Sequence, residues 1–240
     1  MLNISSNIKA LEKLPKPQAI IFDWDNTLVD TWPLIQKAIN VTMEKMAKPL
    51  WTLDQVRDNV HKSMRDYFPD IFGDRWQEAG EIYRNAYQAI NIEQIQLLPN
   101  SLELIKTIKD AKILQFLISN KVGATLRREV KKLQIEQYFF SAIGALDANF
   151  DKPHKSSVDL ALMLSDIDLK KDCVWFVGDT ISDVECAYNT RCHPIIYGHS
   201  SHKISNSISQ EIIENGFNNS GIIPLYFNHQ ELVSVIKNLI

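Results

Sequence analysis

The chain has 240 residues, of which 45% are hydrophobic and 23% are charged, and its formal net charge is −3. These values are ordinary for a globular protein and exclude collagen-like, low-complexity and disordered chains. The 26 basic residues are outnumbered by 29 acidic residues and form no conspicuous cluster, which disfavours a dedicated nucleic-acid-binding protein.

Short apolar runs recur along the chain and predict buried strands. They are Ala19–Phe22, Ile113–Ile118, Cys173–Val177, Ile195–Tyr197 and Leu225–Phe227. Apolar residues spaced three and four apart between these runs predict amphipathic helices. The helical patterns are Leu102–Ile108, Leu126–Leu133, Val158–Leu164 and Leu232–Leu239. Strands that alternate with helices predict an α/β fold with a doubly wound, mostly parallel sheet that is covered on both faces.

The segment between the first two predicted strands breaks this alternation. It is bounded by proline at both ends, shows no convincing strand and contains three helical patterns. Their apolar positions are Leu34/Ala38/Val41, Val56/Val60/Met64 and Trp76/Ala79/Tyr83/Ala86/Ile90. Thr52, followed three residues later by Gln55, predicts a capping box at the start of the second helix. We therefore expect a small helical domain, residues 33–98, inserted into an α/β core that comprises residues 1–32 and 99–240.

The strongest local signal is Asp23-Trp24-Asp25-Asn26-Thr27, directly after the first apolar run. Ligands of parallel sheets bind beyond the carboxyl ends of the strands, so both carboxylates lie where a substrate would arrive. Two such carboxylates repel each other unless a cation or a shared proton offsets their charge, and Mg²⁺ prefers oxygen ligands of this kind. A polar turn that merely ends the strand is the alternative interpretation.

Three further polar elements follow later strands. They are Ser119-Asn120, Lys152-Pro153 and Gly178-Asp179-Thr180-Ile181-Ser182-Asp183. Taken singly, each has an ordinary explanation as a turn, a surface lysine or a helix start. Taken with Asp23 and Asp25, however, Asp179 and Asp183 place four carboxylates at one edge of one sheet. Such a group would be poorly tolerated without a bound cation.

The order of these elements is similar to that of the haloacid dehalogenase (HAD) superfamily: Asp-x-Asp-x-Thr, then Ser-Asn at a strand end, then Lys-Pro, then Gly-Asp-x-x-x-Asp. The resemblance extends from about Ala19 to the C-terminus. The helical insert between the first two motifs resembles the C1-cap branch, which includes phosphoglycolate phosphatases, β-phosphoglucomutases, phosphonatases and haloacid dehalogenases. The resemblance implies a Mg²⁺-dependent phosphatase that hydrolyses a small phosphomonoester through an aspartyl-phosphate intermediate.

The resemblance also implies roles for individual residues. Asp23 would be the nucleophile, and Asp25 would act as general acid and then as general base. Ser119, the amide of Asn120 and Lys152 would bind the phosphate oxygens. The metal ligands would be Asp23, the main-chain carbonyl of Asp25, Asp179, and Asp183 either directly or through water.

Other activities are weighed by the residues that they require. Asp25 disfavours a haloacid dehalogenase, which needs neither a second aspartate nor the metal cluster, and a phosphonatase, which replaces that aspartate by alanine. A phosphomutase of the β-phosphoglucomutase type also needs Asp25 and stays open as the alternative. A non-catalytic binding protein that keeps the fold is disfavoured because the acidic cluster is retained. No GxGxxG or Walker A sequence indicates a nucleotide-binding module.

Two details near these motifs bear on the site. Asn26 stands where glycine is common, and because asparagine tolerates a left-handed backbone we expect the turn to be preserved. Basic residues of the insert either face solvent or reach a second anionic group of the substrate; they are Arg57, His61, Lys62 and Arg65. Lys121, beside Ser119-Asn120, is better placed for such a contact.

The cysteines and the apolar runs predict the cellular location of the protein. The three cysteines form neither a CxxC pair nor an even-numbered framework, which predicts reduced thiols in the cytoplasm. The N-terminal residues show no signal-peptide pattern, and no apolar run is long enough to cross a bilayer. We expect a monomer or weak homodimer whose partner is a small phosphorylated metabolite, with no nucleic-acid and no membrane partner.

Overall fold

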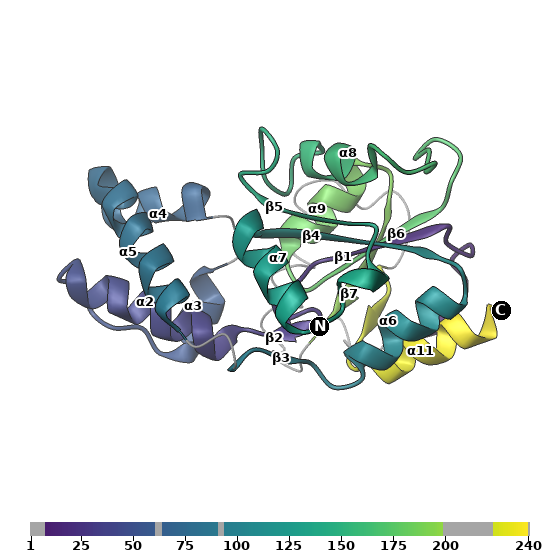
Figure 1. The fold of residues 1–240 in the computed structure, drawn as a ribbon, viewed down its shortest axis with the longest axis horizontal. Coiled ribbons are helices and arrows are strands. Elements are labelled where there is room, and N and C mark those ends of the chain that lie inside the picture. The colour runs from purple at the N-terminus through teal and green to yellow at the C-terminus, as the bar shows by residue number, and fades with distance from the viewer. Residues whose placement is uncertain (1–7, 61–63, 91–93, 199–222, 240) are drawn as a thin grey trace, which may run out of the picture.

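A six-stranded sheet forms the centre of the computed structural model, which describes residues 8–60, 64–90, 94–198 and 223–239. Its strands run in the order β5-β4-β1-β6-β7-β8, and every neighbouring pair is parallel (Figure 1). The strands are β1 Ala19–Phe22, β4 Leu114–Val122, β5 Ser141–Ala145, β6 Val174–Gly178, β7 His193–Tyr197 and β8 Leu225–Tyr226. Because β1 lies between β4 and β6, the three strands that lead into predicted motifs are neighbours.

Helices cover both faces of this sheet. Those of the core are α1 Ile8–Leu11, α6 Ser101–Asp110, α7 Gly123–Lys132, α8 Ser156–Leu162, α9 Ile181–Asn189 and α11 His229–Asn238. Phe22 and Leu117 belong to the hydrophobic cluster formed with α6, α7 and α11, whereas Ile21 and Phe116 belong to the cluster formed with α8 and α9. Successive strand residues therefore face opposite layers. This arrangement confirms the predicted doubly wound α/β fold.

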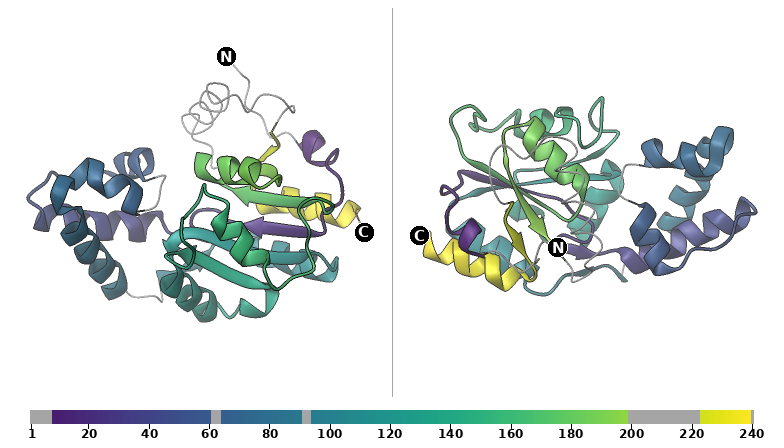
Figure 2. Two further views of the ribbon diagram at one scale, coloured as in Figure 1. Left: turned by 90° about the horizontal axis from the view of Figure 1, so that it is seen from above. Right: turned by 180° about the vertical axis from the view of Figure 1, so that it is seen from behind.

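Four helices lie beside the sheet and not on either of its faces, as the two views of Figure 2 show. They are α2 Trp32–Lys45, α3 Leu53–Asn59, α4 Met64–Phe72 and α5 Trp76–Ala89, with the short 3₁₀ turn η1 Gly73–Arg75 before α5. Helix α2 packs against α5, and an antiparallel pair of two-residue strands, β2 Val29–Asp30 and β3 Gln96–Leu97, lies where the chain enters and leaves this group. The division of the chain into two domains stays a prediction.

Local signals in the insert and after β1 are confirmed in detail. The capping box of α3 is complete: Gln55 N donates to Thr52 Oγ1 at 3.2 Å, and Thr52 N donates to Gln55 Oε1 at 2.9 Å. Asn26 has a φ of 60°, so it adopts the left-handed backbone that the missing glycine would have supplied. The capping box of α3 and the left-handed turn at Asn26 are therefore both as the sequence predicts.

One predicted helix is wrong in its extent, and the sequence does not predict the strands β3 and β5. The pattern Val56/Val60/Met64 was interpreted as one helix, but α3 ends at Asn59 and α4 begins at Met64. The insert also contains the strand β3, which is too short to show a pattern. The edge strand β5, Ser141–Ala145, was not predicted, because its sequence Ser-Ala-Ile-Gly-Ala lacks the continuous large apolar residues of a central strand.

The second predicted strand also continues further than expected. β4 runs to Val122, so Ser119 and Asn120 lie within the strand and not after it. The pairing of β4 with β5 is irregular between Ile118 and Val122. This irregularity takes the intervening residues out of the regular ladder, and it leaves their polar groups available at the carboxyl edge of the sheet.

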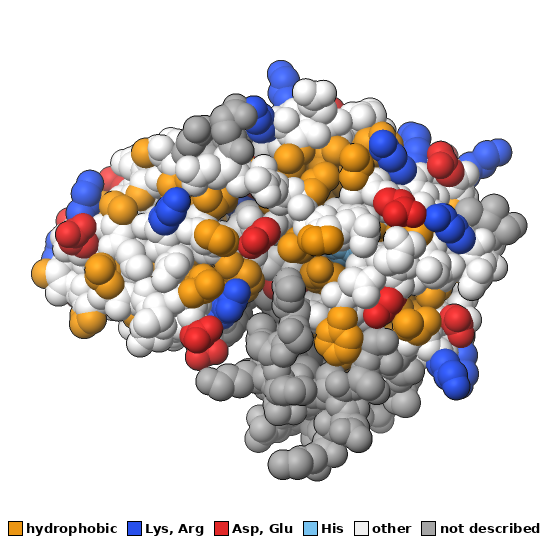
Figure 3. All heavy atoms as spheres, turned by 90° about the horizontal axis from the view of Figure 1, so that it is seen from below, with side chains coloured by type: hydrophobic (Ala, Val, Ile, Leu, Met, Phe, Trp, Pro, Cys, Tyr) orange, Lys and Arg blue, Asp and Glu red, His pale blue; other side chains and the backbone are white. Residues whose placement is uncertain are grey.

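The surface, the helices and the thiols of the described residues add three observations. On the face shown in Figure 3, acidic and basic side chains are interspersed. Within the described ranges, no helix combines the length and the apolar character that a membrane crossing requires. Cys173, Cys186 and Cys192 are all free thiols.

A buried histidine connects the C-terminal helix to the loop that follows β1. His229, which is 0% exposed, donates from Nε2 to the carbonyl of Thr27 at 2.8 Å and accepts at Nδ1 from the Tyr226 hydroxyl at 3.2 Å. Its ring stacks on Tyr197 with 4.4 Å between the centroids. Burial lowers the pKa of His229 to about 4, against an opposing effect of the hydrogen bond to Thr27. The folded protein therefore holds this imidazole neutral.

The stability of the protein should depend on pH through His229. An unfolded histidine has a pKa near 6.5, so the unfolded state binds this proton first and the free energy of unfolding falls as the pH drops from about 6.5 toward 4. This contribution is up to about 1.4 kcal/mol per pH unit. Urea unfolding of wild type and His229→Gln across that range should show a shallower slope for the variant. Equal slopes would contradict the prediction.

Candidate active site

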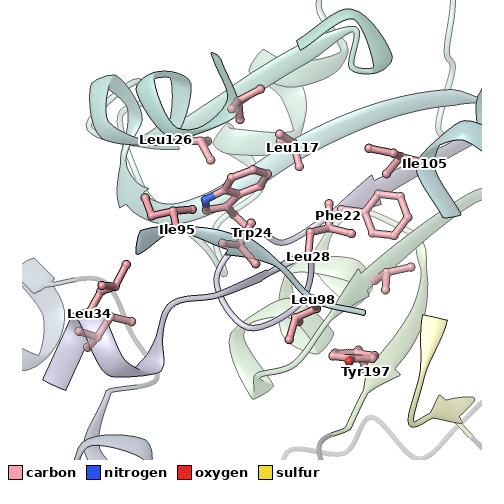
Figure 4. Close-up of a cluster of buried hydrophobic side chains, with 14 of the residues drawn as sticks. Phe22, Trp24, Leu28, Leu34, Ile95, Leu98, Ile105, Leu117, Leu126 and Tyr197 are labelled. Atoms are coloured by element: carbon pink, nitrogen blue, oxygen red, sulfur yellow. The ribbon is translucent and has the colours of Figure 1, made fainter. Parts of the chain in front are cut away.

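The loop after β1 carries two acidic side chains, Asp23 and Asp25, on either side of the buried Trp24. The Trp24 side chain is fully buried and lies among apolar residues that include Leu28, Leu117 and Leu126 (Figure 4). Asp23 N donates to the carbonyl of Val177 on β6 at 2.8 Å, which continues the parallel ladder by one residue. The tryptophan thereby fixes the loop and presents the carboxylates that flank it to the carboxyl edge of the sheet.

Asn26 connects this loop to the first helix of the insert. Its side-chain Oδ1 accepts from the backbone N–H groups of Thr31 at 3.2 Å and Trp32 at 3.1 Å. The helix α2 begins at Trp32, and Thr31 makes no side-chain cap of its own. Asn26 therefore satisfies donors at the start of α2 that would otherwise lack a partner.

The second acidic pair follows β6, at the start of α9. Asp183 Oδ2 accepts from Thr180 N at 3.0 Å and from Thr180 Oγ1 at 2.7 Å, which closes the first turn of the helix. Gly178 makes room for this turn, since a Cβ atom there would lie 2.3 Å from Asp183 Cγ. The Thr27 hydroxyl lies 3.5 Å from Asp23 Oδ2 and 3.4 Å from Asp179 Oδ1, so it bridges the two loops.

Asp23, Asp179 and Asp183 form a buried acidic cluster. One carboxylate oxygen of each lies within 4.8 Å of the others. Burial, the charge of Asp183 and the charge of Asp25 raise the pKa of Asp23 to about 7, although Lys152 opposes the shift. Burial and the charges of Asp23 and Asp183 also raise the pKa of Asp179. The cluster therefore carries more negative charge than its surroundings stabilise, and its all-oxygen donor set fits a hard divalent cation.

Lys152 occupies the gap between two members of this cluster. Its Nζ lies 2.5 Å from Asp23 Oδ1 and 2.6 Å from Asp183 Oδ1, and the residue is 3% exposed. Burial disfavours the charged ammonium, but the carboxylates of Asp183 and Asp23 more than offset this and raise the pKa of Lys152. The lysine therefore stays charged beside Asp23.

Ser119 and Asn120 bring two further polar groups to the same edge. Ser119 Oγ accepts from Lys121 N at 3.1 Å, and its hydroxyl hydrogen remains available. The side-chain amide of Asn120 donates to the carbonyl of Lys152 at 3.3 Å, which holds the Lys152 loop against β4. Asn120 Oδ1 is buried without a hydrogen-bond partner.

One cavity collects nearly all of these groups. It contains about 1000 Å³ of empty space, part of it open to solvent, and lies between the sheet edge and the helical insert. The sequence-predicted residues that line it are Asp23, Asp25, Ser119, Asn120, Lys152 and Asp179. Asp183 lies behind Lys152 and does not line the cavity. The insert contributes aromatic rings, including Tyr67, Tyr83 and Tyr87, together with Arg84 and Gln88.

Of the four basic residues of the insert that the sequence singles out, the structure describes Arg57 and Arg65, and neither lines this cavity. Arg57 Nη1 lies 3.5 Å from Asp54, and its guanidinium lies over the Trp32 ring. Arg65 Nε donates to Asp151 Oδ2 at 2.5 Å, next to Lys152 in the chain. These two arginines are thus engaged by the protein itself. His61 and Lys62 lie outside the described residues.

Sequence reasoning missed two residues beside Asp25. Glu129 on α7 and Tyr87 on α5 both contact the Lys121 ammonium, which in turn contacts Asp25. Glu129 sits within an ordinary amphipathic pattern, and Tyr87 follows Tyr83 at a spacing typical of a helix core. The only available signal was the charge of Glu129 next to apolar positions of α7, which by itself indicates nothing about a site.

Comparison with known proteins identifies the class to which this fold and this site belong. Residues 20–196 match the family model described as haloacid dehalogenase-like hydrolase. The chain therefore belongs to the haloacid dehalogenase-like hydrolases, as its motif order predicted.

Individual relatives lie within the same family. Pyrophosphatase PpaX from Listeria monocytogenes is 24% identical over 175 residues, which cover 72% of this chain and 80% of the relative. A phosphoglycolate phosphatase from Pseudomonas savastanoi is 26% identical over 200 residues, covering 78% of this chain and 71% of the relative. The crystal structure of a HAD-superfamily hydrolase from Ehrlichia chaffeensis is 29% identical with a TM-score of 0.63, covering 95% of this chain and 99% of that one.

The space kept by Gly178 gives a test of the packing at this site. In Gly178→Ala, the new methyl would overlap Asp183, and relieving the overlap should destabilise the protein by about 1–3 kcal/mol. Gly80→Ala on α5 is the matched control, because its nearest neighbour would be the mobile Arg84 Nη1 at 3.4 Å. There the better helix propensity of alanine should be neutral or stabilising by up to about 1 kcal/mol. Urea unfolding that ranks the two variants in the opposite order would contradict the assignment.

Proposed function

We propose that the protein is a Mg²⁺-dependent phosphatase that hydrolyses a small phosphomonoester through an aspartyl-phosphate on Asp23. The observation that carries this proposal is the position of the Asp23 carboxylate. It lies in a cavity that also holds the Lys152 ammonium, the Ser119 hydroxyl and the acidic group of Asp179. The proposed nucleophile Asp23, the Lys152 ammonium and the proposed metal ligand Asp179 therefore line the same cavity. The phosphatase names of two relatives agree with this chemistry.

The acidic cluster suits Mg²⁺ with a division of labour among its members. We propose that Asp23, Asp179 and the main-chain carbonyl of Asp25 would hold the ion directly. Both oxygens of Asp183 already accept hydrogen bonds from Lys152 and Thr180, which supports a contact through water. When bound, Mg²⁺ would offset phosphoryl charge and align the substrate.

The residues of the chain would then divide the reaction between them. A carboxylate oxygen of Asp23 attacks phosphorus, and the bond from phosphorus to the leaving oxygen breaks. Asp25 gives a proton to that oxygen and later accepts a proton from the water that hydrolyses the aspartyl-phosphate. The Ser119 hydroxyl, the backbone amide of Asn120 and the Lys152 ammonium bind the non-bridging oxygens, which spreads the charge that develops on them.

The proposed function also includes a substrate class, a cellular location and an oligomeric state. We propose a small phosphorylated metabolite as the substrate, and a cytoplasmic location for which the three free cysteines are the support. The proposed oligomeric state is a monomer or weak homodimer. In the mutase alternative the phosphoryl group returns to another hydroxyl, so release of inorganic phosphate separates the two activities.

Replacing the proposed nucleophile should abolish turnover. Asp23→Asn keeps the shape of the side chain but removes the anionic oxygen that attacks phosphorus, so phosphate release should fall by at least about 10⁴-fold while the protein stays folded. Asp159→Asn, an exposed aspartate on α8 that pairs with Lys155, is the matched control and should keep wild-type turnover. The measurement is phosphate release from a panel of phosphomonoesters with and without chelator. Turnover that survives in Asp23→Asn would refute the assignment.

Mg²⁺ should stabilise the protein more strongly at higher pH. Without metal, the pKa of Asp23 is raised to about 7, so the folded state retains a proton that the unfolded state releases near pH 4. Stability of the metal-free protein therefore falls as the pH rises from about 4 to 7. A bound cation replaces that proton, and the increase in melting temperature at one fixed Mg²⁺ concentration should be larger at pH 8 than at pH 5.5. A pH-independent increase would contradict this model, and Asp179→Asn should reduce the increase at both pH values.

A further inference from the structure

A network of four side chains, Trp24, Tyr87, Lys121 and Glu129, is connected to the proposed acid–base residue through Lys121. Lys121 Nζ lies 2.6 Å from Asp25 Oδ1, 2.7 Å from Glu129 Oε2 and 2.9 Å from the Tyr87 hydroxyl. Glu129 also accepts from Trp24 Nε1 at 2.7 Å and from the Tyr87 hydroxyl at 3.1 Å. The Lys121 side chain is 8% exposed and that of Glu129 is 0% exposed.

The hydrogen-bonding capacity of Lys121 is fully used inside this network. An ammonium group has three donors, and three acceptors surround Nζ: Asp25, Glu129 and Tyr87. Lys121 therefore has no donor left for a substrate oxygen. Although it lines the cavity, as its position beside Ser119-Asn120 suggested, its contacts are those of a residue that holds another side chain.

Glu129 has no reason to be buried on α7 except these partners. A fully buried carboxylate is strongly destabilising unless it is paired and hydrogen-bonded. Each partner comes from an element of the site: Trp24 from the loop after β1, Lys121 from β4 and Tyr87 from α5. Through Trp24 and Lys121, Glu129 thus fixes the residue beside Asp25 as well as the cation that contacts it.

We propose that Lys121 and Glu129 are positioning residues that hold the Asp25 carboxyl for proton transfer to the leaving oxygen, and that the Tyr87 hydroxyl makes this arrangement depend on α5 of the helical insert. The inference rests on the proposed function, in which Asp25 is the general acid. Lys121 occupies Oδ1 of Asp25, which leaves Oδ2 to carry the proton. Tyr87 supplies the contact from the insert side of the cavity.

The proposal is tested by the basicity of the leaving group. Phenolate, with a pKa near that of tyrosine at about 10, leaves readily only when it is protonated, whereas p-nitrophenolate is a far weaker base and leaves without a proton. Phenyl phosphate and p-nitrophenyl phosphate have closely similar shapes. Their ratio of kcat/KM, which reports only the steps up to departure of the leaving group, measures how well Asp25 delivers its proton.

The variants are Lys121→Met, Glu129→Gln and Tyr87→Phe, with Lys237→Met as the control. Lys237 is an exposed lysine paired with Glu103 on α6. Lys121→Met should lower kcat/KM for phenyl phosphate at least about 10-fold more than for p-nitrophenyl phosphate, within the 10²–10⁴-fold range of general acid catalysis. Glu129→Gln and Tyr87→Phe should shift the ratio in the same direction, and Lys237→Met should leave it unchanged. Tyr87→Phe removes one hydroxyl and provides the readout even if a charge variant fails to fold.

Coupling to Asp25 separates positioning from a general structural role. In an Asp25→Ala background, adding Lys121→Met should change the ratio by less than about 2-fold, because the residue that it holds is gone. If the Lys121 and Tyr87 variants lower both substrates equally, or if the double variant shifts the ratio further, the inference is overturned while the proposed function stands. If wild type releases no phosphate, or Asp25→Ala keeps the wild-type ratio, the proposed function fails and the inference fails with it.

Discussion

The central constraint of this structure is the negative charge that the chain gathers at the carboxyl edge of its sheet. Asp23, Asp179 and Asp183 lie within reach of one ion, and all three are buried. Burial, together with the mutual repulsion of the carboxylates, raises the pKa of Asp23 and Asp179. Lys152 contacts two of these carboxylates and offsets part of their charge.

The two buried lysines offset the charge of different carboxylates. Lys152 compensates the cluster directly and reaches Asp23, where phosphoryl charge would develop. Lys121 compensates Asp25 and Glu129 and shares a hydrogen bond with Tyr87. Trp24 lies between the two acidic residues of the loop, of which Asp23 contacts Lys152 and Asp25 contacts Lys121. Each lysine thus offsets the charge of a different set of carboxylates.

Much of this arrangement could be predicted from the sequence, because strand ends are strongly patterned. Continuous apolar runs such as Ala19–Phe22 locate the central strands, and polar residues at their ends locate the site. The edge strand β5 is not predicted because Ile143 is its only large apolar residue. The sequence does not indicate Glu129 and Tyr87, because their contacts depend on which helices meet across the cavity. Sequence periodicity does not predict contacts between distant helices. The extension of β4 past Ser119 depends likewise on an irregular pairing with a distant strand.

The contact between His229 and Thr27 affects when the loop after β1 can reach its final conformation during synthesis. The two residues are separated by 202 positions, yet the carbonyl of Thr27 lies in the loop that carries both proposed reactive carboxylates. A growing chain synthesises the helix that steadies this loop about 200 residues after the loop itself. The loop therefore lacks this hydrogen bond until α11 has been made, and nascent chains that stop before α11 would carry every motif residue without the support that holds the first motif in place.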